Sequence, residues 1–137
     1  STSAFAENAL RVAFLSAEPV QISALIDVTA QYEQLNPGIN VEVQAFSDAA
    51  FKANIDQWLE NGDFDVIHWQ AGQRLMRYVD SDLVSALNEF INVDELNQHF
   101  DNTVLGQLER NGQFYGLPIA TYAWGFYYNK HLFIICG

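Results

Sequence analysis

The segment Leu10–Phe46, LRVAFLSAEPVQISALIDVTAQYEQLNPGINVEVQAF, carries the patterns of a strand, a helix and a second strand in succession. Leu10–Leu15 is a short run of mostly apolar residues, typical of a buried strand. Pro19 suits the first turn of a helix, and apolar residues then recur at helical spacing. Asn36-Pro37-Gly38 ends that helix, and Ile39–Phe46 alternates apolar and polar residues as a half-buried strand does. The segment therefore predicts a strand–helix–strand unit.

Strand and helix patterns continue to alternate after this unit. Ser47 is placed to cap the next helix. That helix carries the apolar stripe Phe51, Ile55, Trp58 and Leu59 and ends at Asn61-Gly62. The chain then predicts a strand over Phe64–Trp69, a short helix over Arg74–Val79 and a loosely helical connector over Leu83–Ile91. A last helix, marked by Phe100, Val104, Leu105 and Leu108, is expected to end at Asn111-Gly112. Such alternation predicts an α/β fold with a mostly parallel, doubly wound sheet flanked by helices.

This architecture predicts where a ligand would bind. In open α/β sheets, ligands lie in the crevice outside the carboxyl ends of the strands. Here those ends are Ser16–Glu18, Phe46–Asp48 and His68–Gln73. We expect their polar and aromatic side chains to converge on one rim.

Trp69 is the sharpest single candidate on that rim. One interpretation makes it a core residue that packs against the following helix. The other makes it a flat apolar platform whose indole N–H remains a donor, suited to the C–H face of a sugar ring. Gln70, Gln73 and Arg74 would then hydrogen-bond the hydroxyl groups around the ring.

The charge balance argues against a nucleic-acid partner. The chain has 17 acidic and 6 basic side chains and a net charge of -11. Nucleic-acid binding normally begins with a basic surface, which this sequence lacks. The basic residues are scattered, so they form no polybasic membrane patch. No apolar run approaches the ~20 residues that span a bilayer.

Sequence motifs for catalysis or cofactor binding are weak or missing. The glycines fit no phosphate loop, and no Gly-x-Ser-x-Gly elbow occurs. His68, His99 and His131 lack partners at metal-ligand spacing. Asp63-x-Asp65 and Asp80-x-Asp82 match a metal-binding pattern, but turn and capping roles are commoner for such residues. We therefore expect no catalytic residue, metal or cofactor, with a divalent-metal-dependent α/β enzyme that uses Asp63 or Asp65 as an alternative.

Four segments, in order and spacing, carry a resemblance to a known family. They are Ile22–Val43 with its YEQLNPGI core, Gly62–Trp69 (GDFDVIHW), Leu83–Leu87 (LVSAL), and Tyr115–Pro118 (YGLP) followed by Tyr127–Phe133 (YYNKHLF). The set, which covers about residues 10–133, resembles the family 1 extracellular solute-binding proteins of bacterial ABC importers, the group that includes maltose-binding protein. The resemblance implies a periplasmic-binding-protein-like lobe, one of two that close around a solute.

The resemblance also implies a domain organisation. Residues 10–119 would form the first lobe, and residues 120–137 the hinge-crossing strand and the truncated start of a second lobe. Residues 1–9 would be disordered or a signal-peptide remnant, because Ala4 and Ala6 fit a small-x-small cleavage pattern. The protein would then be exported to the periplasm. A single lobe should bind its sugar weakly or not at all, since such sites bury most of the ligand surface.

The site residues follow partly from the strand ends and partly from the resemblance, since sugar-binding relatives place an aromatic where Trp69 stands. Polar side chains follow that aromatic, and other ligand-binding residues lie on the crossing strand. The expected ligand-binding residues are Trp69, Gln70, Gln73, Arg74, Glu18, Tyr122 and Trp124. Phe64 replaces the usual proline of the family, and Tyr122 stands where maltodextrin binders carry an acid. The identity of the sugar therefore stays open.

Together these observations predict a non-enzymatic, periplasmic solute-binding component of an ABC importer. Its partners would be a small-molecule solute, a sugar by resemblance, and the membrane subunits of the importer. The aromatic crossing strand, if uncovered, would also favour self-association. An extracytoplasmic ligand-sensing domain of a membrane signalling protein is the alternative within the same fold.

Overall fold

The computed structural model describes residues 9–120 of the 137-residue chain, which divide into two compact parts after Ala86. The predictions for a signal-peptide remnant, a hinge-crossing strand and the start of a second lobe fall wholly or almost wholly outside these residues. The domain boundaries expected from the sequence therefore stay predictions.

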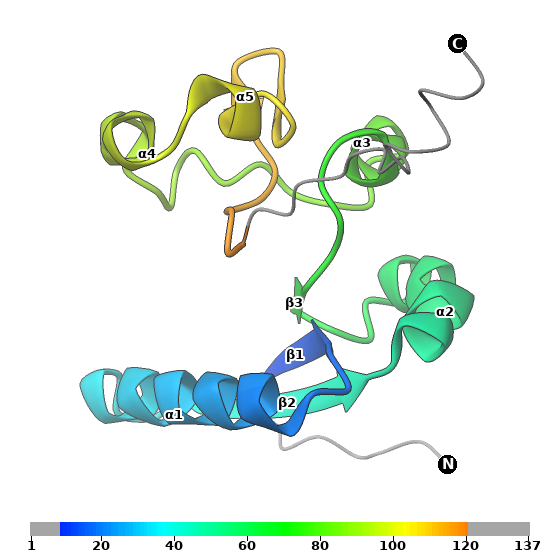
Figure 1. Cartoon of the computed structure of the whole chain (residues 1–137), viewed down its shortest axis with the longest axis vertical. Helices are drawn as coiled ribbons and strands as arrows, with labels where there is room; N and C mark the ends of the chain where they lie inside the picture. The colour runs from blue at the N-terminus through cyan, green and yellow to red at the C-terminus, as the bar shows by residue number, and fades with distance from the viewer. Residues whose placement is uncertain (1–8, 121–137) are drawn as a thin grey trace, which may run out of the picture. The chain divides into compact units, whose positions relative to one another are not determined.

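A three-stranded parallel sheet forms the centre of the first part. Its strands are β1 (Ala9–Leu15), β2 (Asn40–Phe46) and β3 (Val66–Ile67), in the order β2-β1-β3 (Figure 1). The register places Leu10 opposite Val41 and Val12 opposite Val66. All three strands therefore end at the same edge of the sheet, as the alternating pattern predicts.

Three helices accompany this sheet. The helix α1 (Pro19–Leu35) connects β1 to β2, α2 (Asp48–Asn61) connects β2 to β3, and α3 (Gln73–Asp80) follows β3. Because β1 lies between β2 and β3, the two crossovers run in opposite directions along the sheet. The right-handed rule for such crossovers then places α1 and α2 on opposite faces, which is the doubly wound arrangement.

The third strand is shorter than its apolar pattern suggests. We expected a strand over Phe64–Trp69, whereas the ladder with β1 covers only Val66–Ile67. The flanking amides of Asp65 and His68 still donate to the carbonyl oxygens of Arg11 and Ala13, both at 2.9 Å. The strand direction therefore persists through His68, and Trp69 follows directly at the strand end.

The turn from α1 into β2 explains much of the YEQLNPGI motif. The Glu33 carboxylate accepts a hydrogen bond from the Val41 amide at 2.6 Å. The Asn36 side chain donates to the carbonyl of Tyr32 at 2.8 Å. Gly38 has a φ of 98°, a value that side-chain-bearing residues rarely adopt. The motif therefore anchors the end of a helix to the start of the next strand.

The core of the first part lies between the sheet, α2 and α3. Its buried members are Ala13, Phe51, Ile55 and Tyr78. Partly buried aromatic rings surround them, with Phe46 and Trp58 at 4.5 Å between centroids. The predicted caps of α2 are confirmed: Ser47 Oγ accepts from the Ala50 amide at 3.4 Å, and Gly62 is left-handed with a φ of 65°. These contacts fix α2 on the sheet.

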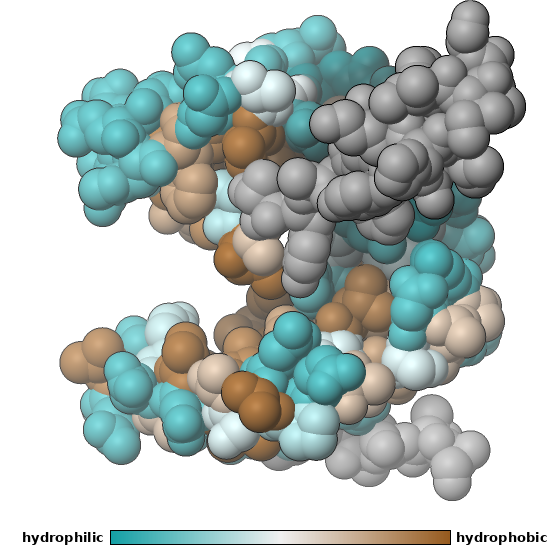
Figure 2. Space-filling view, in the orientation of Figure 1, coloured by the Kyte–Doolittle hydropathy of each residue, from teal (hydrophilic) through white to brown (hydrophobic). Residues whose placement is uncertain are grey.

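The outer surface of α1 is unusually apolar. None of its residues is buried, and Val20 and Leu35 are each 81% exposed. Apolar side chains are visible among polar ones along this helix in Figure 2. Among residues 9–120, no helix is long and apolar enough to cross a membrane.

The second part corrects two sequence-based predictions. Its elements are α4 (Val93–His99), α5 (Asn102–Leu105) and an antiparallel hairpin of β4 (Glu109–Arg110) and β5 (Gln113–Phe114). The segment Leu83–Ile91 forms turns and irregular chain rather than a loose helix. The helix expected over Phe100–Leu108 is one short turn, because Phe100 leaves α4 in extended conformation and Asp101 caps a new start.

The Asn111-Gly112 pair, expected to end a helix, instead forms the turn of the hairpin between β4 and β5. Both residues have positive φ, 56° and 78°. Such a pair is the preferred two-residue turn between antiparallel strands. Asn88 holds the hairpin, since its side chain donates to the Gly112 carbonyl at 3.1 Å and accepts from the Phe114 amide at 2.8 Å.

Candidate functional site

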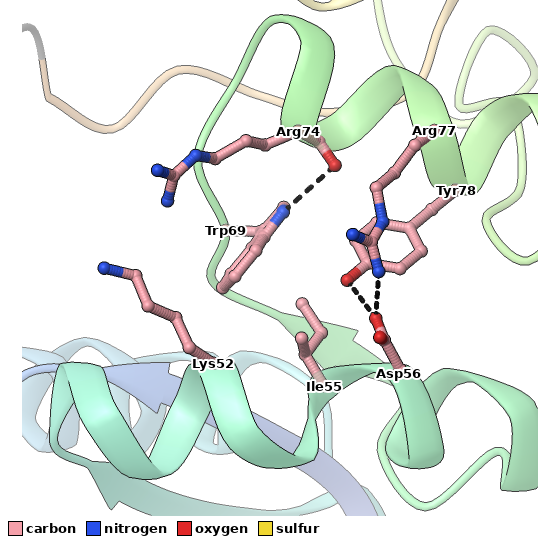
Figure 3. A pocket seen from close by; sticks show the side chains of 7 residues that line it. All are labelled: Lys52, Ile55, Asp56, Trp69, Arg74, Arg77 and Tyr78. Atoms are coloured by element: carbon pink, nitrogen blue, oxygen red, sulfur yellow. Dashed lines mark hydrogen bonds and ion pairs between the residues drawn. The ribbon is translucent and has the colours of Figure 1, made fainter.

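A pocket of about 210 Å³ lies in the first part of the chain, beyond the carboxyl end of β3 (Figure 3). Its walls come from α2, α3 and Trp69, the second residue after β3. The lining residues are Lys52, Ile55, Asp56, Trp69, Arg74, Arg77 and Tyr78. The pocket therefore occupies the edge where the α/β fold is expected to bind a ligand.

The lining residues on α2 and on α3 have the same spacing in the sequence. Lys52, Ile55 and Asp56 stand at positions i, i+3 and i+4 of α2, and Arg74, Arg77 and Tyr78 repeat that spacing on α3. Residues so spaced lie on one side of a helix. Of these six, sequence reasoning proposed Arg74 alone. The paired spacing was a usable signal, but only once α2 and α3 were known to face each other.

Trp69 packs against the core, as one of the two interpretations expects, and it also lines the pocket. Its ring stacks on Phe51 with centroids 5.6 Å apart and an interplanar angle of 18°. It meets Tyr78 edge-on at 6.2 Å. The indole Nε1–H donates to the Arg74 carbonyl at 3.3 Å. Trp69 is thus anchored in the core, yet it still lines the pocket.

A closed polar cluster occupies one side of the pocket. The Tyr78 hydroxyl donates to Asp56 Oδ1 at 2.5 Å, and Arg77 Nη2 donates to the same oxygen. The Arg77 guanidinium lies 4.6 Å from the centroid of the Tyr78 ring. The hydrogen bond from Tyr78, reinforced by Arg77, lowers the pKa of Asp56. Burial, and then the bond to Asp56, raises the pKa of Tyr78 to about 12.

The remaining two cations reach the other side of the Trp69 ring in the view of Figure 3. Lys52 forms an ion pair with Asp48, one helical turn earlier, at 2.6 Å. Within residues 9–120, no carboxylate lies at ion-pair distance from the Arg74 guanidinium. In that view both cationic groups lie on the side of the indole away from Asp56.

The other residues predicted for the site lie outside the pocket wall or outside the described chain. Gln70 is half-buried, and Gln73 is exposed as the first residue of α3. Glu18 is exposed before α1, where its backbone N–H donates to Ser16 Oγ at 3.0 Å. None of these three lines the pocket. Tyr122 and Trp124 fall outside the described residues, so the site prediction as a whole stays untested.

His68 faces away from this pocket. Its ring stacks on Phe14 at 4.9 Å, as expected when successive residues of an extended chain point to opposite faces. Its Nδ1 atom is buried without a hydrogen-bond partner among the described residues. Burial lowers the pKa of His68.

Asp65, the second member of the Asp63-x-Asp65 pattern, binds an arginine. The Arg11 guanidinium donates to both Asp65 oxygens, at 2.7 and 3.0 Å, which ties β1 to the segment before β3. Asp82 has a φ of 57°, as in a turn. Among the described residues, no group of three His, Cys, Asp or Glu side chains is arranged to hold a metal ion.

Comparison with known sequences identifies the family. The profile of the bacterial extracellular solute-binding protein family matches residues 17–133. The chain belongs to this family. A Brucella abortus (strain 2308) protein described as a binding protein is 35% identical over 115 residues, which cover 81% of this chain and 27% of that protein. A Brucella suis biovar 1 (strain 1330) protein gives the same values. This solute-binding chain thus spans about a quarter of the length of the curated relatives it matches.

Solved structures confirm the fold. The bacterial solute receptor AcbH superposes with a TM-score of 0.72 over 93% of this chain and 32% of AcbH, at 20% identity. A protein from a study of xylan utilization by Caldanaerobius polysaccharolyticus gives 0.68 over 80% of this chain and 28% of its own, also at 20% identity. CpMnBP1, solved with mannotriose bound, gives 0.67 over 82% and 28%, again at 20% identity. The predicted family and the periplasmic-binding-protein-like fold are both confirmed.

Proposed function

We propose that this solute-binding protein is a periplasmic carbohydrate-binding component of an ABC importer. The observation that carries the proposal is the Trp69 pocket beyond the carboxyl end of β3, in a chain of the solute-binding family. Two structural neighbours support a sugar as ligand. AcbH is described as exclusively preferring β-D-galactopyranose, and CpMnBP1 was solved with mannotriose.

The chemistry of the pocket suits a sugar. The Trp69 ring offers an apolar surface for the C–H face of a pyranose, and the surrounding side chains offer several donors and one carboxylate acceptor for hydroxyl groups. The cluster of Asp56, Arg77 and Tyr78 is already internally bonded, so its geometry is set before a ligand arrives. We assign Gln70, Gln73, Glu18, Tyr122 and Trp124 to the rim of the same site.

The size of the pocket suits one half of a closing site. Its volume of about 210 Å³ lies below the roughly 300–1,000 Å³ of complete ligand pockets. In our proposal residues 10–119 form the first lobe, residues 120–137 lead into a second lobe, and closure of the two lobes completes the enclosure. Delivery to importer subunits in the membrane would follow closure.

Titration of the 137-residue chain with galactose, xylose and mannotriose, followed by NMR, tests the proposal. We expect weak, saturable binding that shifts the indole N–H resonance of Trp69. The Trp69→Phe variant, followed through the backbone amide resonances of Lys52 and Arg74, should bind more weakly, because phenylalanine has a smaller ring and lacks the donor to Arg74. Trp58→Phe, in the same aromatic core but outside the pocket wall, is the matched control. Absence of binding to all three sugars would contradict a carbohydrate site.

A further inference from the structure

The pocket carries positive charge that the composition of the chain does not predict. Three of its lining residues, Lys52, Arg74 and Arg77, are basic, and one, Asp56, is acidic. The chain as a whole has 17 acidic and only 6 basic side chains. Half of the basic residues of a strongly acidic protein therefore gather around one tryptophan.

These three cations differ in their availability to a ligand. Arg77 is neutralised by Asp56, which also accepts from Tyr78. Lys52 pairs with Asp48, but the two side chains are 43% and 59% exposed, and exposed pairs one helical turn apart are weak. The Arg74 guanidinium has no ion-pair partner within residues 9–120. Arg74 is therefore the primary anchor available for an anion, with Lys52 as a second cation.

The side chains that are already bonded to one another and the cations that can bind an anion lie on different sides of the indole. In Figure 3 the bonded group of Asp56, Arg77 and Tyr78 lies on one side of the indole, and the ends of Lys52 and Arg74 lie on the other. The Asp56 charge is compensated by Arg77, which reduces its repulsion of an incoming anion. A planar guanidinium can also donate two parallel hydrogen bonds to one carboxylate.

We propose that the ligand of this pocket is an acidic sugar, a uronate, whose ring packs on Trp69 and whose carboxylate binds Arg74. Lys52 adds a second favourable charge beside that carboxylate. This inference rests on the proposed function, since it takes the ligand to be a carbohydrate. It goes further in assigning the ligand a negative charge, which galactose and mannotriose do not carry.

Matched pairs of neutral and acidic sugars test the inference on the 137-residue chain. Galactose with galacturonate, and glucose with glucuronate, differ only in a carboxylate at C6. NMR titrations at constant ionic strength would follow the Trp69 indole N–H. We expect one uronate to bind about tenfold more tightly than its neutral partner, as a charge-assisted hydrogen bond to arginine allows. Added NaCl should shrink that preference, because salt screens exposed charges.

Variants identify the residue responsible for the preference. Arg74→Gln should reduce the uronate-to-neutral affinity ratio about tenfold, because the charge is lost while the backbone acceptor for Trp69 remains. Arg74→Lys should keep part of the ratio. Arg110→Gln, which makes the same charge change in β4, should leave it unaltered. Thermal unfolding of each variant checks that the fold is intact.

The possible outcomes separate this inference from the proposed function. Equal affinities within both pairs overturn the acidic-sugar proposal and leave a neutral-sugar site standing. A ratio that survives Arg74→Gln overturns the role of Arg74. Acetate that shifts Trp69 as strongly as a uronate shows an anion site without sugar recognition and overturns the inference. If no sugar in either pair binds, the acidic-sugar inference fails, whereas the proposed function fails only if xylose and mannotriose do not bind either.

Discussion

At the scale of single residues, the chain uses its aromatic side chains on both faces of the sheet. Trp69 stacks on Phe51 on the α2 side, whereas His68 stacks on Phe14 on the opposite side. Two consecutive residues therefore place a half-buried titratable ring and a pocket-lining ring on opposite faces of the sheet. The two neighbours should respond to quite different perturbations.

His68 should make the stability of the protein depend on pH near neutrality. Burial lowers the pKa of His68 in the folded state, so the unfolded chain binds the proton more readily. The free energy of unfolding is then fully retained above about pH 6.5, the pKa of an unperturbed histidine, and falls as the pH drops below it. Urea unfolding between neutral pH and about pH 5 measures this slope.

The His68→Phe variant isolates this contribution. Phenylalanine can keep the stack on Phe14 and removes the buried Nδ1 atom that lacks a partner. The variant should lose the slope below about pH 6.5 while retaining acid destabilisation at lower pH. That second phase belongs to carboxylates such as Asp56 and Asp65, whose pKa values are lowered by their hydrogen bonds. An unchanged slope in the variant would exclude His68 as its origin.

The residues that line the pocket show what a sequence can reveal at this scale. The places of Trp69 and Arg74 in the pocket wall were predictable, because a strand end in an α/β fold points to the ligand edge. Lys52, Asp56 and Tyr78 were not, because a helix pattern gives the buried stripe but not which helix faces which. The Arg77–Asp56–Tyr78 cluster joins residues 21 and 22 positions apart, and it exists only through tertiary packing.

At the scale of elements, the strand–helix–strand segment was predictable and the second part was not. The segment from β1 to α2 carries periodicity, caps and stop signals that all agree. Between Leu83 and Phe114 the apolar residues serve turns and a hairpin, and periodicity alone cannot separate these from a helix. Asn111-Gly112 illustrates the ambiguity, since the same pair can end a helix or turn a hairpin.

Glu33 should control the junction between α1 and β2. Its carboxylate accepts the Val41 amide at 2.6 Å, so Glu33→Ala leaves that donor without this partner. We expect a loss of about 1.5–3 kcal/mol in unfolding free energy, typical of a hydrogen bond to a charged group. Hydrogen exchange at the Val41 amide should accelerate. Gln34→Ala, on the exposed neighbour, is the control; equal exchange rates at Val41 in both variants would contradict the role of Glu33.

Gly112 should be the position of the hairpin at which substitution destabilises the protein most. It has a φ of 78°, and an added Cβ would meet nothing within 4 Å. Gly112→Ala should therefore cost about 1–2 kcal/mol from backbone conformation alone. Exchange of the Leu87 amide, which donates to the Phe114 carbonyl at 2.8 Å, reports on the hairpin. Gln113→Ala lacks the positive φ and should change this exchange far less; similar acceleration in both would point to a cause other than the turn.

At the scale of the whole molecule, the net charge of -11 contrasts with the three basic side chains that line the pocket. Like charges repel one another across the folded surface, and that repulsion weakens the compact state. The ion pairs of Arg11, Lys52 and Arg77 oppose it locally. Because the chain has 17 acidic and only 6 basic side chains, repulsion among the carboxylates should outweigh the attraction within the ion pairs.

Salt should accordingly stabilise this protein. Raising NaCl from about 0.01 M to 0.15 M shortens the Debye length from about 30 to 8 Å, which screens repulsion between distant carboxylates more than it screens contact pairs. We expect the melting temperature at pH 7 to rise over this range, and a smaller rise near the isoelectric point of about 4.3, where the net charge vanishes. Scanning calorimetry measures both series. A melting temperature that falls with NaCl at pH 7 would mean that the three ion pairs outweigh the excess of acidic charge. In that case the ion pairs of Lys52 and Arg77, two of the cations that line the pocket, would contribute to the stability of the fold.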